Sequence, residues 1–213
     1  MERKIQTQKT GRYFVSADID SQTKHVWFVM HGYGQLAQFF IRKFQQLPPE
    51  HVVVAPEGMH RFYLQGTDGR VGASWMTKEA REDDIQDYIR FLDGVFSDLD
   101  LSNKNIKTHV LGFSQGTATA SRWVSYGDVR FDSLILWAGV LAPDLDFKIS
   151  KEKLFGKKIV LAYGTRDQYR SEERIEEQRQ IFNQHELPFQ EIEFEGEHTI
   201  YPEPLLKVAD ILK

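Results

Sequence analysis

Residues 106–126 read IKTHVLGFSQGTATASRWVSY and contain the pattern that decides the fold. Ile106–Leu111 is apolar and partly β-branched and predicts a strand, and the stretch from Gln115 to Tyr126 predicts a helix. Between them Gly112-Phe113-Ser114-Gln115-Gly116 forms a Gly-x-Ser-x-Gly turn in the strand-to-helix context of a nucleophilic serine. So sharp a turn strains Ser114, and glycines on both sides leave room for neighbouring elements. We therefore expect an exposed hydroxyl at a helix N-terminus, which favours a developing oxyanion.

Strand-like and helix-like segments alternate along the rest of the chain from residue 25 onward. Further apolar runs predict strands at His25–Met30, His51–Ala55, Ser133–Ala138, Lys158–Tyr163 and Phe189–Phe194. Apolar residues at helical spacing predict helices at Gln35–Leu47, Glu79–Leu99, Ser171–Glu186 and Pro204–Leu212. This alternation predicts an α/β fold in a single domain over residues 1–213, with a mostly parallel central sheet and helices on both faces.

Two segments stand outside this alternation. Arg12–Asp18 is expected to add an edge strand that runs antiparallel through the turn at residues 18–21. Pro56–Thr77 is rich in glycine and aromatic residues, and we expect it to be a long irregular loop. Loops of that length inside a domain tend to carry function, so this stretch is a candidate wall of a pocket.

Composition excludes several classes of function. The 213 residues include 27 Lys and Arg against 31 Asp and Glu, and this net charge of −4 argues against a nucleic-acid partner. The chain has no cysteine, which excludes thiolate nucleophiles and cysteine-based metal sites. Histidines and carboxylates lack the spacing of metal ligands, so neither a metal nor another cofactor is expected. With a polar N-terminus and no apolar run of the roughly 20 residues that a membrane span needs, we expect a soluble, cytoplasmic protein.

The turn after the strand His25–Met30 has two interpretations. Residues 32–37, Gly-Tyr-Gly-Gln-Leu-Ala, fit the pattern of a dinucleotide-binding fold, with Glu57 where a ribose-binding acid would fall. In a serine hydrolase, His31-Gly32-Tyr33-Gly34 would instead supply the second N–H of the oxyanion hole. Tyr33 and Gln115 are then the two backbone donors. The second interpretation is preferred because it explains both glycine-rich turns.

A nucleophilic serine needs a base downstream in the chain, because this kind of turn occurs in the order serine, acid, histidine. His198 follows the strand Phe189–Phe194, at the sheet edge where open α/β sheets place their sites, and is preferred over His185 in a polar helical stretch. His31 and His109 are expected to be structural, with His31 hydrogen-bonding the turn beside it.

The acid has two candidate positions. Asp167 follows the strand Lys158–Tyr163 in a short turn and is the preferred candidate. Asp144 or Asp146, after the preceding strand, would be its replacement. A different role for Asp167, as the cap of the next helix, is also open.

Four short motifs together resemble the phospholipase/carboxylesterase family of α/β hydrolases, which includes the acyl-protein thioesterases. They are Gly-Phe-Ser-Gln-Gly at 112–116, His-Gly-Tyr-Gly at 31–34, Gly-Thr-Arg-Asp at 164–167 and Gly-Glu-His at 196–198. The resemblance covers nearly the whole chain and implies an α/β-hydrolase fold without a separate cap domain. It implies Ser114 as nucleophile, Asp167 as acid, His198 as base, and Tyr33 and Gln115 as oxyanion donors.

The function that follows is hydrolysis of carboxylic esters or thioesters through an acyl-enzyme, without a cofactor. The expected partner is a small-molecule or acylated substrate, and a homodimer is left open. Candidate residues of the acyl pocket are Tyr63, Trp75, Met76 and Leu141, with simple packing as the alternative. The alternatives to a hydrolase are a non-catalytic small-molecule binding module on the same fold and a dinucleotide-dependent oxidoreductase that uses Gly32–Ala37.

Overall fold

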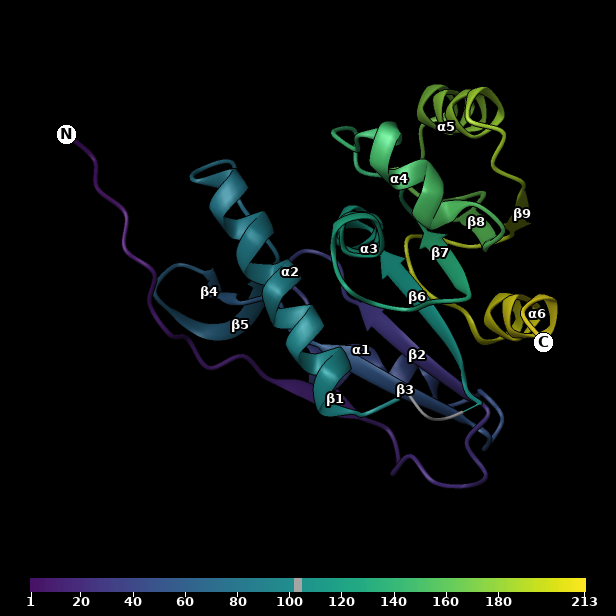
Figure 1. Cartoon of the computed structure of the whole chain (residues 1–213), viewed down its shortest axis with the longest axis horizontal. Coiled ribbons are helices and arrows are strands. Elements are labelled where there is room, and N and C mark those ends of the chain that lie inside the picture. The colour runs from purple at the N-terminus through teal and green to yellow at the C-terminus, as the bar shows by residue number, and fades with distance from the viewer. Residues whose placement is uncertain (102–104) are drawn as a thin grey trace.

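A seven-stranded sheet runs through the computed structural model, which describes residues 1–101 and 105–213 (Figure 1). All neighbouring strands are parallel except β1, which lies antiparallel to β3 at one edge. This architecture confirms the predicted α/β fold with a mostly parallel sheet. In spatial order the strands are β1 (Tyr13–Val15), β3 (His51–Pro56), β2 (His25–Met30), β6 (Lys107–Phe113), β7 (Ser133–Trp137), β8 (Lys158–Gly164) and β9 (Phe189–Phe194).

Helices cover both faces of the sheet because successive residues of its strands point to opposite sides. In β2, Phe28 belongs to a core with residues of α2 and α3, whereas Trp27 belongs to a second core with residues of α1 and α6. One face therefore carries α2 (Arg81–Asp98), α3 (Gln115–Tyr126), α4 (Phe147–Leu154) and α5 (Glu172–Gln184). The other carries α1 (Ala37–Phe40), the 3-10 helix η1 (Ile41–Phe44) and α6 (Pro202–Ile211).

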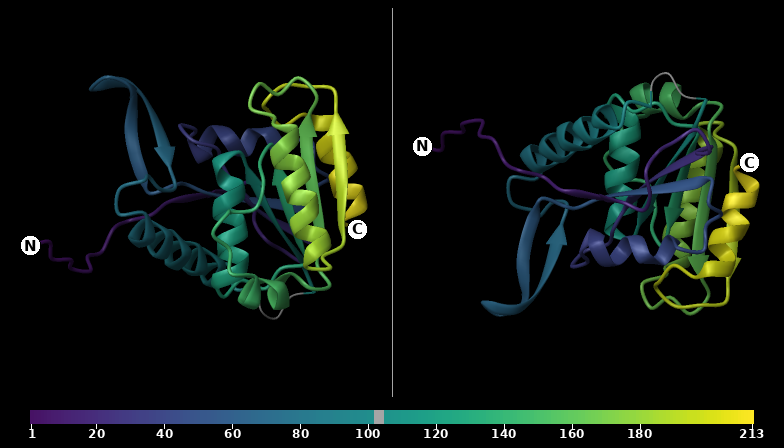
Figure 2. Two further views of the ribbon diagram at one scale, coloured as in Figure 1. Left: turned by 90° about the horizontal axis from the view of Figure 1, so that it is seen from above. Right: turned by 90° about the horizontal axis from the view of Figure 1, so that it is seen from below.

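The stretch Pro56–Thr77 corrects the expectation of an irregular loop. It holds two antiparallel strands, β4 (His60–Gln65) and β5 (Asp68–Ser74), which form a hairpin that projects from the body (Figure 2). Gly66 and Gly69 at its tip have positive φ angles of 68° and 82°, which glycine adopts without strain. The strand signal was weak because much of the hairpin is exposed, so no alternation of buried and exposed residues marks it.

Two helix predictions also need correction. The helix expected over Gln35–Leu47 is replaced by α1 and η1, which end before Pro48 and Pro49. The short helix α4 was not predicted, because only Ser150 and Leu154 of its eight residues are buried. The edge strand at residues 13–15 has the predicted antiparallel direction, and its partner is β3.

The register brings the carboxyl ends of the central strands to one edge. Met30 of β2 lies opposite Gly112 of β6, and Phe113 of β6 lies opposite Trp137 of β7. Further along, Gly164 of β8 lies opposite Phe194 of β9. The loops that follow these strands therefore leave the sheet side by side, and they carry Ser114, Asp167, His198 and Tyr33, while Gln115 begins α3 directly after Ser114.

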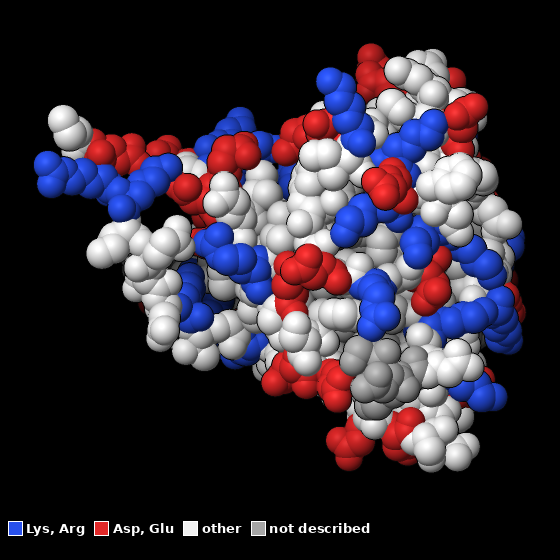
Figure 3. Space-filling view, in the orientation of Figure 1, with Lys and Arg blue, Asp and Glu red and all other residues white. Residues whose placement is uncertain are grey.

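Acidic and basic side chains are interspersed over the face shown in Figure 3, in keeping with the small net charge of −4. Within the described part of the chain, no helix combines the length and the apolar character that a membrane crossing requires.

Candidate active site

Ser114 lies on the turn between β6 and α3 in a backbone conformation that residues other than glycine rarely adopt, with φ 54° and ψ −118°. Its N–H donates to the carbonyl of Trp137 at 2.9 Å. A Cβ atom at Gly112 would lie 2.3 Å from the carbonyl oxygen of Gly116, and one at Gly116 would lie 2.3 Å from that of Met30. The packing of strand and helix therefore allows only glycine on either side of the serine, as the motif predicted.

His198 and Asp167 form a close pair at the same edge of the sheet. Nδ1 of His198 lies 2.6 Å from Oδ2 of Asp167, whose side chain is only 3% exposed. The other carboxylate oxygen accepts the N–H of Tyr169 at 2.8 Å, so both oxygens have partners. The His198 ring packs between Phe113 and Tyr169, with ring centroids at 4.9 and 4.7 Å. The pair is thus fixed in position on both sides.

The loops that carry this pair are docked on one another. The N–H of Arg166 donates to the carbonyl of Gly196 at 2.9 Å, and a Cβ at Gly164 would lie 2.3 Å from the same carbonyl oxygen. Helix α5 is capped by Ser171, whose hydroxyl accepts the N–H of Arg174. The alternative role of Asp167 as a helix cap is therefore corrected.

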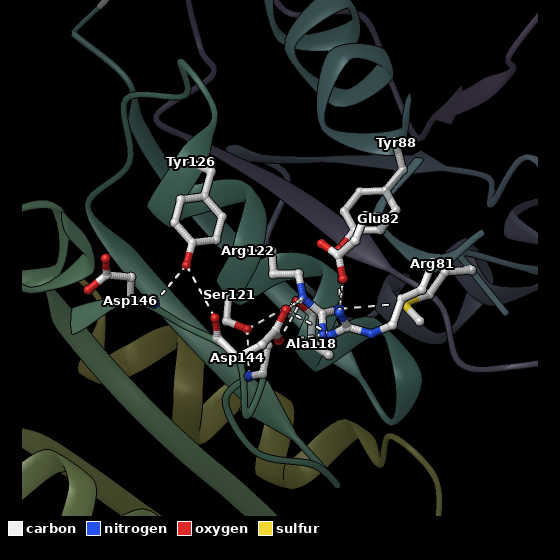
Figure 4. Close-up of polar contacts among 11 residues, drawn as sticks. Arg81, Glu82, Tyr88, Ala118, Ser121, Arg122, Tyr126, Asp144 and Asp146 are labelled. Atoms are coloured by element: carbon white, nitrogen blue, oxygen red, sulfur yellow. Dashed lines mark hydrogen bonds and ion pairs between the residues drawn. The ribbon is translucent and has the colours of Figure 1, made fainter. Parts of the chain in front are cut away.

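Asp144 and Asp146, the other candidate acids, are held elsewhere (Figure 4). Both carboxylate oxygens of Asp144 accept hydrogen bonds from the buried Arg122, and Arg81 reaches the same carboxylate at 2.7 Å. Asp146 caps α4 by accepting the N–H of Lys148 at 2.9 Å. Among these aspartates, the structure brings Asp167 to the histidine.

The turn at residues 31–34 packs against the serine. A Cβ added at Gly32 would lie 3.2 Å from the Cβ of Ser114. The turn is held by the N–H of Gly34, which donates to the Ala73 carbonyl at 2.8 Å, and by the N–H of Gly32, which donates to Oε1 of Gln35 at 2.9 Å. Within residues 1–101 and 105–213, the backbone N–H groups of Tyr33 and Gln115 have no acceptor. Both remain available to a ligand beside Ser114.

His31 stabilises this turn through hydrogen bonds at both of its ring nitrogens. Its Nε2 accepts the N–H of Gly58 at 2.9 Å, so Nδ1 carries the proton and donates to the Gly32 carbonyl at 2.8 Å. Burial lowers its pKa to about 4, which keeps the ring neutral near pH 7. His31 therefore has the structural role expected for it. His109 is likewise buried, between His25 and Ser133.

A cavity of about 380 Å³ opens beside Ser114 and His198. Of the predicted pocket residues, Leu141 lines it. Trp75 does not: it is fully buried in the core and donates to the His31 carbonyl at 2.8 Å. Met76 packs against the same core, and Tyr63 is exposed on β4, outside the cavity.

Sequence reasoning missed much of this cavity's wall. Leu161, Ile175, Arg170 and Arg174 line it, from β8, from α5 and from the loop between them. One indication of their role was present in the sequence: each lies within eight residues of Asp167. A second depression of about 460 Å³, between the hairpin and α1, has Lys43 and Arg70 in its wall.

Glu57, which the dinucleotide interpretation needs as a ribose ligand, is 2% exposed and already bound. Arg12 donates to one of its oxygens at 2.7 Å, and the N–H of Ala37 donates to the other at 3.2 Å. Its carboxylate thus caps α1 in place of a ligand. Among the described residues, no three histidine, aspartate or glutamate side chains are grouped as a metal site would require.

Comparison with known proteins places this geometry in a structural class. No protein-family model and no curated protein sequence matches the chain. Among solved structures, Zea mays acyl-protein thioesterase 2 is 18% identical over 95% of this chain and 98% of that one, with a TM-score of 0.73. The structure of YahD with malic acid is 16% identical over 96% of this chain and 100% of that one, with a TM-score of 0.70. The Bacillus cereus carboxylesterase is 14% identical over 95% of this chain and 93% of that one, with a TM-score of 0.67.

These likenesses extend over almost the full length of each chain, so they concern the fold as a whole. They agree with the resemblance drawn from the four motifs. The chain therefore has the α/β-hydrolase fold of these esterase and thioesterase structures.

Proposed function

We propose that this protein is a serine hydrolase that cleaves carboxylic esters or thioesters through an acyl-enzyme on Ser114. The observation that carries the proposal is the 2.6 Å contact between His198 and Asp167, because the same cavity is also lined by Ser114. A strained serine, a histidine and a buried carboxylate at one sheet edge are the groups that activate a hydroxyl for attack on a carbonyl.

In the first half of the reaction, His198 takes the proton from the Ser114 hydroxyl as its oxygen bonds to the carbonyl carbon. Asp167 holds the ring by Nδ1, so Nε2 is the proton acceptor, and the carboxylate stabilises the imidazolium that forms. The N–H groups of Tyr33 and Gln115 stabilise the oxyanion. The intermediate then expels the alcohol or thiol, which receives the proton from His198, and the acyl group remains on Ser114.

In the second half, water replaces the leaving group. His198 takes a proton from the water as its oxygen bonds to the acyl carbon, and then returns that proton to the Ser114 oxygen. The products are a carboxylic acid and the free enzyme. Neither half needs a redox change or a cofactor, because a single histidine moves every proton.

The alternatives explain less of the structure. A dinucleotide-binding enzyme needs a free acid at Glu57, and that carboxylate is buried against Arg12 and the N-terminus of α1. A binding module without chemistry has no need of a serine in a strained conformation, which costs on the order of 1–3 kcal/mol.

A fluorophosphonate probe tests the proposal. It forms a stable adduct only with a serine that has a working base and oxyanion hole. We expect one adduct by intact-mass measurement, mapped to Ser114, and none with Ser114→Ala or His198→Gln. The matched control is Ser74→Ala, because Ser74 is a buried serine that lies near the site and contacts the side chain of Gln115. Absence of an adduct in correctly folded protein would overturn the proposal.

A further inference from the structure

Cationic side chains line one part of the cavity beside Ser114. Of the described residues in its wall, Arg170 and Arg174 are the cations and Asp167 is the only carboxylate. Asp167 is already engaged by His198. Building on the proposed hydrolase activity, we infer that the preferred substrate carries a carboxylate or similar anionic group that Arg170 and Arg174 recognise.

Two glutamates hold the Arg170 side chain in place, and one of its N–H donors, Nε, is unpaired within the described residues. Its Nη2 contacts Glu193 at 2.8 Å and Glu172 at 2.5 Å, and its guanidinium lies 4.8 Å from the centre of the Tyr163 ring. Its Nε is buried without an acceptor among the described residues. A buried donor left unpaired costs about 1–3 kcal/mol, so Arg170 would gain if its guanidinium turned to share an acceptor with an anionic group in the cavity that it lines.

The acidic partners of Arg170 do not cancel this preference inside the cavity. The side chains of Glu172 and Glu193 are 68% and 50% exposed, and neither lines the cavity. Solvent therefore screens the charges of both glutamates. The two glutamates thus orient the guanidinium from the solvent side.

Arg174 adds a second cation in the first turn of α5, four residues after Arg170. Its side chain is exposed at the cavity and, within the described residues, forms no ion pair or side-chain hydrogen bond. Ser171 lies between the two arginines, and its oxygen already accepts the N–H of Arg174, so its hydroxyl hydrogen is available to donate. Two guanidinium groups and a hydroxyl together match the several acceptor sites of a carboxylate.

Apolar residues fill the remaining wall. Leu141, Leu161 and Ile175 line the cavity together with the arginines. At about 380 Å³ the cavity is of a size that holds a small organic molecule. The substrate class that fits is an ester or thioester with a short aliphatic segment that ends in an anion, on either the acyl side or the leaving-group side.

Paired esters that differ only in charge test this inference. On the acyl side, para-nitrophenyl monoesters of adipic and suberic acid are compared with the corresponding carboxamides, which keep the shape and lose the charge. On the leaving-group side, the acetate ester of para-hydroxybenzoate is compared with that of para-hydroxybenzamide. We expect kcat/KM to favour the carboxylate about tenfold or more in one of the two arms, and that arm identifies the side that enters the cavity.

Variants of Arg174 then assign the preference. Arg174→Gln should lower the carboxylate-to-carboxamide ratio of kcat/KM several-fold, because only Arg170 then remains to bind the anion, and Arg174→Glu should lower the ratio further. Because this side chain is exposed and forms no ion pair or side-chain hydrogen bond with other described residues, both variants should fold. The matched control is Arg90→Gln, which makes the same charge change on an exposed residue of α2 and should leave the ratio intact.

Failure of the inference can be distinguished from failure of the proposed function. Carboxamide esters hydrolysed as fast as carboxylates in both arms, or a ratio unmoved by Arg174→Gln, would overturn the inference and leave the hydrolase standing. If no ester is hydrolysed, titration of the protein with adipate and suberate in a calorimeter still tests whether the cavity binds an anion. Binding that is lost in Arg174→Gln supports the anion site, and absence of binding overturns it.

Discussion

His198 and Asp167 are 31 positions apart in the chain, yet Nδ1 of one lies 2.6 Å from Oδ2 of the other. The parallel strands β8 and β9 bring this about, because Gly164 lies opposite Phe194 and the following loops leave the sheet together. Close packing of Gly164 against Gly196 fixes their separation. The pair is therefore a product of strand register and glycine packing, before any catalytic role is considered.

Asp167→Asn should nearly abolish ester hydrolysis. An amide cannot stabilise the imidazolium and favours the wrong tautomer of His198, so kcat should fall by several orders of magnitude, about 10⁴ by analogy with another serine hydrolase. The measurement is kcat on a neutral para-nitrophenyl ester, with thermal unfolding as the control for the fold. Activity within tenfold of wild type would remove Asp167 from the mechanism.

Asp144→Asn should do the opposite: it should cost stability and leave turnover largely intact. Partial burial acts to raise the pKa of Asp144, but hydrogen bonds from Arg122 and Arg81 outweigh it and lower the pKa to about 2. Removing the charge leaves Arg122, with a side chain only 4% exposed, without its carboxylate. Because Asp144 is itself about one-third exposed, we expect a loss of about 1–2 kcal/mol in urea denaturation, less than for a fully buried pair. A large loss of kcat without a loss of stability would move the acid to Asp144.

Ser114→Gly should give an inactive protein that is more stable than Ser114→Ala. Both substitutions remove the nucleophile, but alanine keeps the Cβ and hence the strain at a φ of 54°, whereas glycine relieves it. We expect a difference of about 1 kcal/mol between the two variants in the free energy of unfolding. Equal stability, or a less stable glycine variant, would show that the turn stores no strain.

Stability should fall as the pH drops from about 6.5 towards 4, because buried histidines cluster at the end of the sheet opposite the active site. Nδ1 of His25 lies 2.8 Å from Nε2 of His109, and the rings of His25 and His51 stack at 4.2 Å. Burial lowers the pKa of all three, to about 4 for His51 and about 3 for His109. Nearby Lys107 lowers the pKa of His25 further, and Glu50 opposes this.

The sign follows from where protons bind. Below the usual histidine pKa of about 6.5 the unfolded chain takes up protons that the folded cluster refuses. Each such histidine can cost up to about 1.4 kcal/mol per pH unit in this window. Urea denaturation at pH 7.5, 6 and 5 measures the slope, and His51→Gln should make it shallower. The same free energy of unfolding at pH 7.5 and pH 5 would contradict the prediction.

The inner strands of the sheet could be predicted because they are buried on both faces and so appear as continuous apolar runs, as in His25–Met30 and Ser133–Trp137. The Gly-x-Ser-x-Gly turn could also be predicted, because backbone atoms approach Gly112 and Gly116 so closely that only glycine fits at either position. In both cases the structural requirement acts on consecutive residues, so a local sequence pattern is enough to predict the element.

The remaining features depend on contacts that no local pattern records. Trp75 was expected in a pocket because it lies in an aromatic-rich stretch, but its indole is buried against Tyr88 and the His31 carbonyl. Arg170 and Arg174 reach the cavity only because α5 packs beside the loop of Asp167. Charged residues in a polar helix resemble any solvated surface, so the sequence offers no sign that these two border the site.

The β4–β5 hairpin shares its backbone hydrogen bonds with the turn that carries Tyr33. The Gly34 N–H donates to the Ala73 carbonyl, the Ala73 N–H donates to the Gln35 carbonyl, and the Tyr33 ring packs against Phe62 at 5.1 Å. The far end of the hairpin stands clear of the body (Figure 2), whereas its base is hydrogen-bonded to the turn that carries the Tyr33 amide. The position of that amide relative to Ser114 is therefore coupled to the position of the hairpin.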